Sequence, residues 1–472
     1  MIKFFAWDFI GKISNLFINF ILVIVLTRLL NPSIFGEIAI IMAFISIATV
    51  FFDAGFTSAI IQRKRLHSSM LDSVFFFNLI IAIFIYIFFF IFVDKIEKFY
   101  NYPELGKYII VASFILIIKA FGSVQKALML KKMLYKQLSI YMTISMLFSG
   151  LISIFLAFNG YGIWSLIFQY VLNELFITIF LWVKSKWRPN FIFSFKAIKL
   201  LFKFGGKVFI VSILNMVFGK IDLIIAAKII SPNVLGFYER AKRLNQIFYN
   251  FTGGSFSSVV FPYFSKIKSK TNFIKVFYKL YLIVNFIIFF LAGIIYLNAE
   301  NIILILFGHK WLKVSLFFKL IILYTMFNIL SVFISNIFLS RGRSDIYLKL
   351  DIMKKIIFLL NVIIGFNFGL IIFLYGNILV GTIQFLIDLY FCSKILKISF
   401  KKYFNIFIIN FFIFLLSNIF SKIILLISQI NVNCFLSFLL NCILFIVIFF
   451  LLHYFLNRKL VEYLSYFIKD KG

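Results

Sequence analysis

Charged and amide side chains interrupt several long apolar stretches of this sequence. An ionisable side chain at the centre of a membrane-spanning helix costs about 2.5–3.5 kcal/mol by insertion scales, so it marks a functional site by default. In a cavity of low dielectric, cations bind an anion strongly, and carboxylates can hold those cations or carry a coupling H⁺ or Na⁺. The candidate ligands are Lys12, Asn15, Asn19, Arg28, Lys119, Lys220, Lys228, Arg240 and Arg243, and the candidate counter-charges are Asp53, Glu174 and Asp222.

The spacing of these residues indicates polar stripes on helices. In four stretches, residues recur at intervals of three, four or seven positions, which places them on one helical face. We therefore expect them to line one central cavity. The stripes are Lys12, Asn15 and Asn19; Ser46, Thr49, Asp53 and Thr57; Asn215, Gly219 and Asp222, with Lys220 nearby; and Arg240, Arg243 and Asn250.

Two less specific interpretations of the charges stay open. Lys12, Arg28 and one or two of the basic residues at 240–243 lie near the ends of apolar stretches, where a long side chain can reach the membrane surface. Lys119 and Glu174 lie near the centres of theirs, where the alternative to a ligand is an ion pair between helices.

The apolar stretches predict an all-α polytopic membrane protein. The 472 residues are 63% hydrophobic and only 14% charged, with a mean hydropathy of +1.08, whereas soluble domains carry about 25% charged residues. A helix crosses a bilayer with about 20 apolar residues. We expect fourteen spans, at 9–30, 37–61, 72–93, 108–130, 138–158, 162–183, 207–230, 241–262, 279–298, 314–339, 346–366, 369–391, 403–428 and 433–456.

The distribution of basic residues predicts the orientation of the chain. The net charge of +32 comes from clusters in every second loop, which is the positive-inside pattern and argues against nucleic acid as a partner. Both termini are therefore expected in the cytoplasm, together with the loops 62–71, 126–136, 184–206, 266–278, 340–349 and 394–402.

The sequence offers little for an enzyme or a metal. The three cysteines lie in or directly next to predicted spans without metal spacing, and the three histidines are scattered over loops and a span end. The longest candidate external loop, 94–107, is short for a catalytic domain, and the N-terminus shows no cleavage site for a signal peptide. We expect no enzymatic activity, no metal and no cofactor apart from a coupling ion.

A gapless repeat organises the chain. Residues 15–61 align with 215–261 at an offset of 200, so that Pro32 and Gly36 of LLNPSIFGEIA correspond to Pro232 and Gly236 of IISPNVLGFYE. Six spans separate the copies, so both enter the membrane from the same side. This predicts two parallel six-helix lobes, 1–190 and 196–397, with a substrate site at their interface. Two further helices at 403–456 and a cytoplasmic tail at 457–472 complete the prediction.

The same segments resemble a known family. TRLLNPSIFGEIAIIMAFISIATVFFDAGFTSAIIQRK (27–64), GKIDLIIAAKIISPNVLGFYERAKRL (219–244) and FPYFSK (261–266) are similar to bacterial polysaccharide exporters. These are the lipid-linked oligosaccharide flippases of the multidrug/oligosaccharidyl-lipid/polysaccharide (MOP) exporter superfamily. The resemblance implies a MATE-like fold of twelve plus two helices and movement of an undecaprenyl-diphosphate-linked glycan across the bacterial inner membrane, for O-antigen, capsule or exopolysaccharide synthesis.

Two other functions remain open alongside the flippase, which would work by alternating access with membrane lipids, a glycan polymerase and glycosyltransferases as partners. An ion-coupled drug or cation antiporter of the same superfamily should have an acidic cavity, whereas the charges within the spans are mostly basic. A membrane scaffold for glycan assembly that transports nothing would not need paired polar stripes.

Overall fold

The computed structural model describes residues 2–428 and 433–457, and the side chains of residues 2–13, 255 and 257–259 are not described. These residues contain helices and no strand, which confirms the predicted all-α class. Eleven of the helices are long and apolar enough to cross a membrane. They coincide with eleven of the fourteen predicted spans, so the count of fourteen stays a prediction.

The other three predicted spans, at 9–30, 241–262 and 346–366, also lie on helices, but these helices are not among the eleven. In the first helix, the part whose side chains are described, Ser14–Leu29, is apolar. The stretch at 241–262 falls on two helices joined by a π turn, and the stretch at 346–366 carries lysines. A helix packed among its neighbours can bury such side chains, so low hydropathy does not prevent it from lying in a bundle.

The helices form two compact units, Met1–Gly236 and Phe237–Gly472. The first contains α1 (Ile2–Leu29), α2 (Pro32–Asp53), α3 (Phe56–Gln62), α4 (Ser68–Tyr100), α5 (Leu105–Lys131), α6 (Tyr135–Phe158), α7 (Ile163–Lys184), α8 (Phe195–Ile229) and the start of α9 (Pro232–Tyr249). The second contains the rest of α9, η1 (Asn250–Gly254), α10 (Ser255–Lys266), α11 (Lys270–Leu297), α12 (Ala299–Leu306), η2 (His309–Trp311), α13 (Val314–Ser340), α14 (Ser344–Asn367), α15 (Leu370–Leu396), α16 (Phe400–Ser428) and α17 (Cys434–Leu456).

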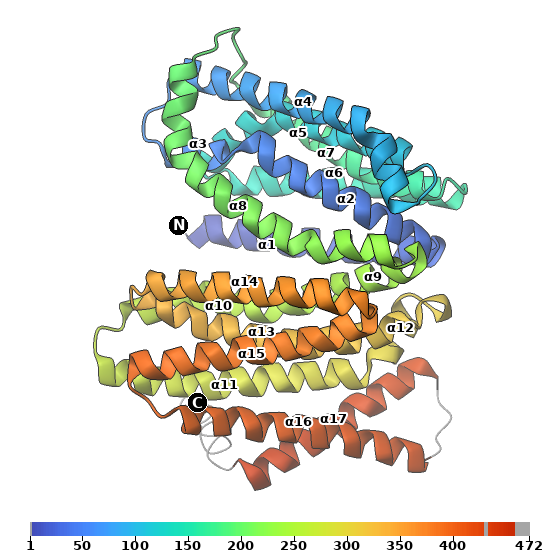
Figure 1. Ribbon diagram of the computed structural model, residues 1–472, viewed down its shortest axis with the longest axis vertical. Helices are drawn as coiled ribbons and strands as arrows, with labels where there is room; N and C mark the ends of the chain where they lie inside the picture. Colours follow the sequence, from blue (N-terminus) through green and yellow to red (C-terminus); the bar gives the residue numbers. More distant parts are fainter. Residues whose placement is uncertain (1, 429–432, 458–472) are drawn as a thin grey trace. The chain divides into compact units, whose positions relative to one another are not determined.

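In the first unit, α8 packs on the helices that precede it. It runs beside α2 in Figure 1 and contacts α2, α3 and α4. The boundary between compact units thus follows α8, whereas the predicted lobe boundary at 190–196 precedes it. The two boundaries describe different properties, namely contact and sequence repetition, and the lobe boundaries stay a prediction.

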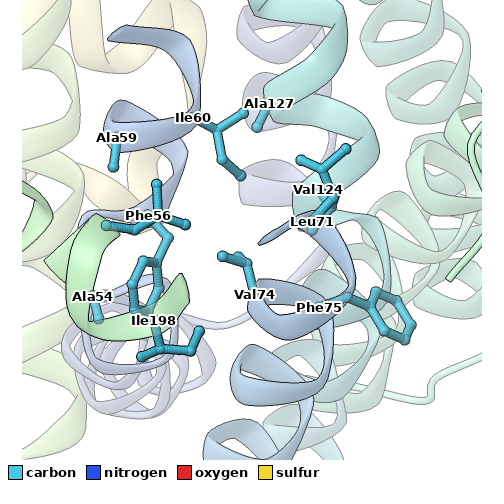
Figure 2. Close-up of a cluster of buried hydrophobic side chains, with 11 residues drawn as sticks. Ala54, Phe56, Ala59, Ile60, Leu71, Val74, Phe75, Val124, Ala127 and Ile198 are labelled. Atoms are coloured by element: carbon cyan, nitrogen blue, oxygen red, sulfur yellow. The ribbon is translucent and has the colours of Figure 1, made fainter. Parts of the chain in front are cut away.

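The end of α8 nearest Phe195 is held by an apolar cluster. Phe56 of α3, Val74 of α4 and Val124 of α5 meet Ile198 and Leu201 of α8, and all five are buried. Figure 2 shows the side chains of Phe56 and Ile198 side by side in this cluster. Burial of such a side chain contributes about 1.5–3 kcal/mol, so these contacts fix α3 against α8.

In the second unit, α13 is the central helix. It packs against α10, α11 and α15, and most of its residues are buried. The helices α16 and α17 pack against each other and against α11.

The two copies of the repeat share a break in their second helix. Between α2 and α3, Ala54 and Gly55 take left-handed φ angles of 42° and 75°. At the corresponding place in the second copy, the π turn η1 (Asn250–Gly254) separates α9 from α10. A π turn inserts a residue into the helical ladder and often occurs at functional positions. The breaks therefore agree with the repeat that the sequence predicts.

Candidate functional site

The repeated Pro–Gly motif forms a close crossing at the start of α2 and α9. A Cβ atom on Gly36 would lie 2.9 Å from the carbonyl carbon of Pro232 and 3.1 Å from the amide nitrogen of Gly236. Reciprocally, a Cβ atom on Gly236 would lie 2.8 Å from the carbonyl carbon of Pro32 and 3.2 Å from the amide nitrogen of Gly36. The two copies of the motif therefore meet each other, and both need glycine because any side chain would strike the opposing backbone.

A second glycine contact joins α8 to the break after α2. A Cβ atom on Gly55 would lie 2.8 Å from the carbonyl carbon of Gly205, and one on Gly205 would lie 3.0 Å from the carbonyl oxygen of Gly55. The positive φ of Gly55 also favours glycine. Hence α8 approaches the α2–α3 segment closely at Gly205 and Gly55. The start of α9, which follows α8, crosses the start of α2 at Gly236 and Gly36.

Asp53 lies at the break and caps the short helix α3. Its carboxylate oxygen Oδ1 accepts hydrogen bonds from the backbone N–H of Thr57 at 3.3 Å and from the Thr57 hydroxyl at 2.5 Å. Asp53 and Thr57, which the sequence places on one polar stripe, are thus hydrogen-bonded to each other. Asp53 has a structural role, since carboxylates near helix starts satisfy free N–H groups.

A polar groove lies between this break and α8. Its volume is about 480 Å³, and among the described side chains that line it Asp53 is the only charged one. Hydroxyls and an amide supply the remaining polar atoms, and these groups donate to and accept from hydroxyl-rich ligands. Of the predicted cations of the first unit whose side chains are described, none lines this groove, so these residues offer no cationic partner to an anion there. The lining residues are Thr49, Val50, Asp53, Gly55, Ser58, Val208, Ser212, Asn215 and Met216.

Lys119 and Glu174 form an ion pair between α5 and α7. The Lys119 ammonium lies 3.3 Å from a carboxylate oxygen of Glu174, with 35% and 23% of the two side chains exposed. This is the partner pairing that the sequence left open as the alternative to a substrate role. An anion could bind Lys119 only by sharing or displacing Glu174.

The site residues predicted on α1 differ in their contacts and in their exposure. The Asn15 amide donates to the Thr143 hydroxyl of α6 at 3.1 Å, which is a contact between helices. Asn19 is half-buried, and Arg28 is exposed in the last turn of α1. The side chain of Lys12 lies outside the described part of the chain.

The end of α8 is tied to the connection between α4 and α5. The Tyr102 hydroxyl lies 3.0 Å from the Ala227 carbonyl oxygen and 2.9 Å from that of Ile230. Burial, and secondly the charge of Glu37, raises the pKa of Tyr102 to about 12, so it stays a donor. The Lys228 ammonium contacts the Phe99 carbonyl oxygen and lies 4.7 Å from the Phe99 ring centroid. The structure thus gives Lys228 local partners at the helix end.

The other predicted residues of α8 and α9 differ in exposure. On α8, Asp222 is buried and Lys220 is half-buried. In the second unit, Arg240 is buried and its guanidinium lies 2.7 Å from the carboxylate of Glu239, whereas Arg243 is exposed. Glu239 directly precedes Arg240 in the sequence, and their pairing was not predicted.

A buried ion pair in the second unit was missed as a pair. Lys354 of α14 contacts Asp388 of α15, whose side chain is fully buried. Ser331 and Ser335 of α13 donate to the same carboxylate oxygen at 2.5 and 3.3 Å. Lys354 lies inside the predicted span 346–366, and in the structure it belongs to α14, which begins ten residues earlier, at Ser344. No group of three or more His, Cys, Asp or Glu that could hold a metal occurs in the described ranges.

Solved structures share this fold. The inward closed conformation of the lipid II flippase MurJ superposes with a TM-score of 0.74 at 16% identity, over 98% of this chain and 100% of that one. An inward-facing MATE multidrug resistance transporter of the MOP superfamily superposes with a TM-score of 0.60 at 14% identity, over 81% and 95%. The chain therefore has the fold of a MOP-superfamily membrane transporter.

The sequence comparisons give the family. The chain belongs to the polysaccharide biosynthesis protein family, whose model matches residues 25–316. The lipopolysaccharide biosynthesis protein WzxC of Escherichia coli K12 is 24% identical over 84% of this chain and 82% of its own length. The teichuronic acid biosynthesis protein TuaB of Bacillus subtilis 168 is 23% identical over 76% and 75%.

A further relative matches over a shorter length. The succinoglycan biosynthesis transport protein ExoT of Rhizobium meliloti 1021 is 24% identical over 55% of this chain. The match covers 53% of ExoT, so this chain spans about half the length of that relative. The resemblance of the sequence to bacterial polysaccharide exporters is thereby confirmed.

Proposed function

We propose that this protein is a flippase that moves an undecaprenyl-diphosphate-linked oligosaccharide across the bacterial inner membrane by alternating access. The observation that carries the proposal is membership of the polysaccharide biosynthesis protein family over residues 25–316. A relative named as a biosynthesis transport protein and the fold shared with a lipid II flippase support it. In the proposed topology, fourteen helices cross the membrane and both termini are cytoplasmic.

The polar groove of the first unit supports a glycan as part of the cargo. Its hydroxyls, the Asn215 amide and the Asp53 carboxylate suit the hydroxyl groups of a sugar. In this proposal, Asp53 uses the oxygen that does not cap α3. A cation carrier would also use a carboxylate, but one acid among several hydroxyls gives weak charge attraction and many hydrogen-bonding positions.

The diphosphate would be held by cations outside this groove. Lys220, Arg243 and Arg28 are proposed ligands that are exposed or half-buried, and each of them also interacts with other residues in this conformation. Lys119, Lys228 and Arg240 have partners in this conformation, so they would bind the diphosphate only after a change of partner. Lys12, Asn15 and Asn19 stay proposals on the α1 stripe, with Glu174 and Asp222 as counter-charges and H⁺ or Na⁺ as the coupling ion.

Two single variants, Asn215→Leu and Asp53→Asn, test whether the groove binds the glycan. We expect Asn215→Leu to reduce surface polysaccharide at normal protein level, because it removes both the donor and the acceptor of the amide. Met216→Leu is the matched control, since it changes a neighbouring lining residue without a polar loss. Normal export by both Asn215→Leu and Asp53→Asn would exclude the groove from the transport path.

The orientation is tested by a single cysteine introduced at position 66 or 268. Both positions lie in loops that the charge distribution places in the cytoplasm. A thiol reagent that cannot cross the membrane should label neither position from outside intact cells and both positions after permeabilisation. Labelling from outside would reverse the proposed topology.

A further inference from the structure

A basic groove lies in the second unit, where α10 ends and α11 begins. Its volume is about 510 Å³, within the range of small-molecule sites. It adjoins the loop 266–278, which is predicted to face the cytoplasm. We therefore expect the groove at the depth where helices leave the hydrocarbon core and phospholipid headgroups begin. The polar lining residues are Tyr263, Asn272, Lys275, Tyr278 and Lys279.

Three buried aromatic rings fix α10 against α11 beside this groove. The ring centroid of Phe264 on α10 lies 4.9 Å from that of Phe273 and 6.4 Å from that of Phe277, both on α11. All three side chains are buried, and each is next to a lining residue in the sequence. Packed rings hold the backbone in place, so the groove is a formed site between two fixed helices.

The segment that borders the groove is strongly basic. Residues 266–279 contain five lysines and no acidic residue. Lys275 and Lys279 are four positions apart on α11, which places them on one face, and both are exposed and line the groove. The Lys402 ammonium of α16 lies 4.2 Å from the ring centroid of the lining residue Tyr278. Three cations therefore lie in or beside the groove.

The carboxylates of the second unit are engaged elsewhere. Among its described residues five are acidic, and each is paired with a cation outside the groove. Within residues 237–428 and 433–457, no ion pair or hydrogen bond is found for Lys275. The tail at 458–472 has four basic and two acidic residues, so it adds no net negative charge. An anion from outside the chain is therefore needed to balance the groove. The five pairs are Glu239 with Arg240, Glu300 with Lys319, Asp345 with Arg343, Asp351 with Lys355 and Asp388 with Lys354.

Exposed lysines at a helix end indicate no site by themselves. The positive-inside pattern supplies them in many loops, and their long side chains reach water unaided. Other cations of the same unit are nevertheless neutralised by nearby acids, as Arg343 is by Asp345 and Lys355 by Asp351. The segment 266–279 has no such acid and forms the wall of a groove that also carries two tyrosines. This combination is what indicates an anionic ligand.

We propose that this groove binds the phosphate of an anionic phospholipid. The phosphate would lie between Lys275 and Lys279, and the apolar lining residues Ile267 and Val276 would contact the glycerol backbone and the first methylene groups. A lipid is favoured over a soluble anion because basic residues, tyrosines and apolar side chains together suit the membrane boundary. A zwitterionic lipid is disfavoured, because its own ammonium group already neutralises its phosphate.

Native mass spectrometry of the purified full chain in detergent tests the proposal. The protein is mixed with equal amounts of phosphatidylglycerol and phosphatidylcholine of identical acyl chains, and the retained lipid is counted. We expect phosphatidylglycerol to be retained in preference. Lys275→Gln should weaken this preference about fivefold, which is the effect of one basic residue at a membrane surface. The double variant Lys275→Gln with Lys279→Gln should weaken it about 25-fold.

The double variant Lys349→Gln with Lys394→Gln is the matched control. Both lysines are exposed, belong to the same unit and lie in loops predicted to be cytoplasmic, but neither lines the groove. The control loses the same charge and should retain phosphatidylglycerol like the unaltered chain. An equal loss of preference in the control would show general charge attraction and overturn the site, as would an unchanged preference in the groove variant.

Two competitors distinguish the sources of the phosphate. Millimolar inorganic phosphate and undecaprenyl diphosphate, the latter at the concentration of the phosphatidylglycerol, are each added to the lipid mixture. We expect neither to displace phosphatidylglycerol. Displacement by inorganic phosphate would assign the groove to a soluble anion, and displacement by undecaprenyl diphosphate would assign it to the transported lipid. Either result, or equal retention of the two phospholipids, would overturn the proposal.

Discussion

Substitution of Gly36 by alanine should destabilise the protein through the crossing of the repeated motifs. The added Cβ would lie 2.9 Å from the carbonyl carbon of Pro232, and Cβ atoms do not approach backbone atoms that closely. Both neighbours are backbone, so no side chain can rotate away and the two segments must separate. Overpacking of this kind costs typically about 1–3 kcal/mol. We expect the same range for Gly236→Ala, because its contact with Pro32 is reciprocal.

The double substitution separates this explanation from an independent effect at each glycine. Once the crossing has opened for one methyl group, the second needs less room, so Gly36→Ala with Gly236→Ala should cost less than the sum of the two. The assay is thermal unfolding of the purified protein in detergent, together with its abundance in membranes. Gly219→Ala is the control, since nothing lies within 4 Å of its Cβ position. Single substitutions as harmless as Gly219→Ala would refute the reasoning.

Three other predictions concern paired groups. Lys119→Ala should lower protein abundance, because it leaves the charge of Glu174 without its partner; this costs about 3–5 kcal/mol in a buried pair and less in a part-exposed pair such as this one. The double variant Lys119→Ala with Glu174→Ala should restore abundance. If export is lost although abundance is restored, Lys119 acts on the substrate. Lys354→Ala should lower protein abundance more than Lys119→Ala does, because it leaves the fully buried Asp388 without its cation. The double variant Lys354→Ala with Asp388→Ala should recover stability. Equal losses of abundance from Lys354→Ala and Lys119→Ala would contradict the argument from burial. Tyr102→Phe should cost about 0.5–1.5 kcal/mol. Its pKa is raised from about 10 in the unfolded chain to about 12, so the difference from the unaltered chain should be constant near neutral pH and shrink as pH rises above about 10; a change between about pH 6 and 8 would contradict the assignment.

The helices and the repeat could be predicted from the sequence, but most of the partners of the charges could not. Hydropathy reports which segments are apolar, and the offset of 200 residues identified Pro32 and Gly36 with Pro232 and Gly236. Nothing in that offset indicated that the two copies would contact each other. A repeat shows which positions are equivalent, whereas contact depends on how the helices pack.

The ion pairs show where sequence reasoning was limited. Lys119 and Glu174 were recognised as possible partners because both lie near the centres of apolar stretches, and they are paired. Lys354 and Asp388 lie nearer the ends of theirs, where a charged side chain is expected to reach water. Their burial depends on the serines of α13, which are 57 and 53 positions from Asp388 in the sequence. Only the tertiary packing of α13, α14 and α15 could reveal that site.

Transbilayer movement of the lipid-linked oligosaccharide tests the proposed function most directly. Purified protein is placed in vesicles that carry the undecaprenyl-diphosphate-linked glycan in one leaflet, and a glycosidase that cannot cross the membrane reports its arrival in the other. The account predicts that the glycan becomes accessible only in vesicles that contain the protein, and more slowly with Asn215→Leu than with Met216→Leu. The account is contradicted if the glycan does not move. If the same vesicles exchange a cationic dye for H⁺ or Na⁺, the protein is an antiporter instead.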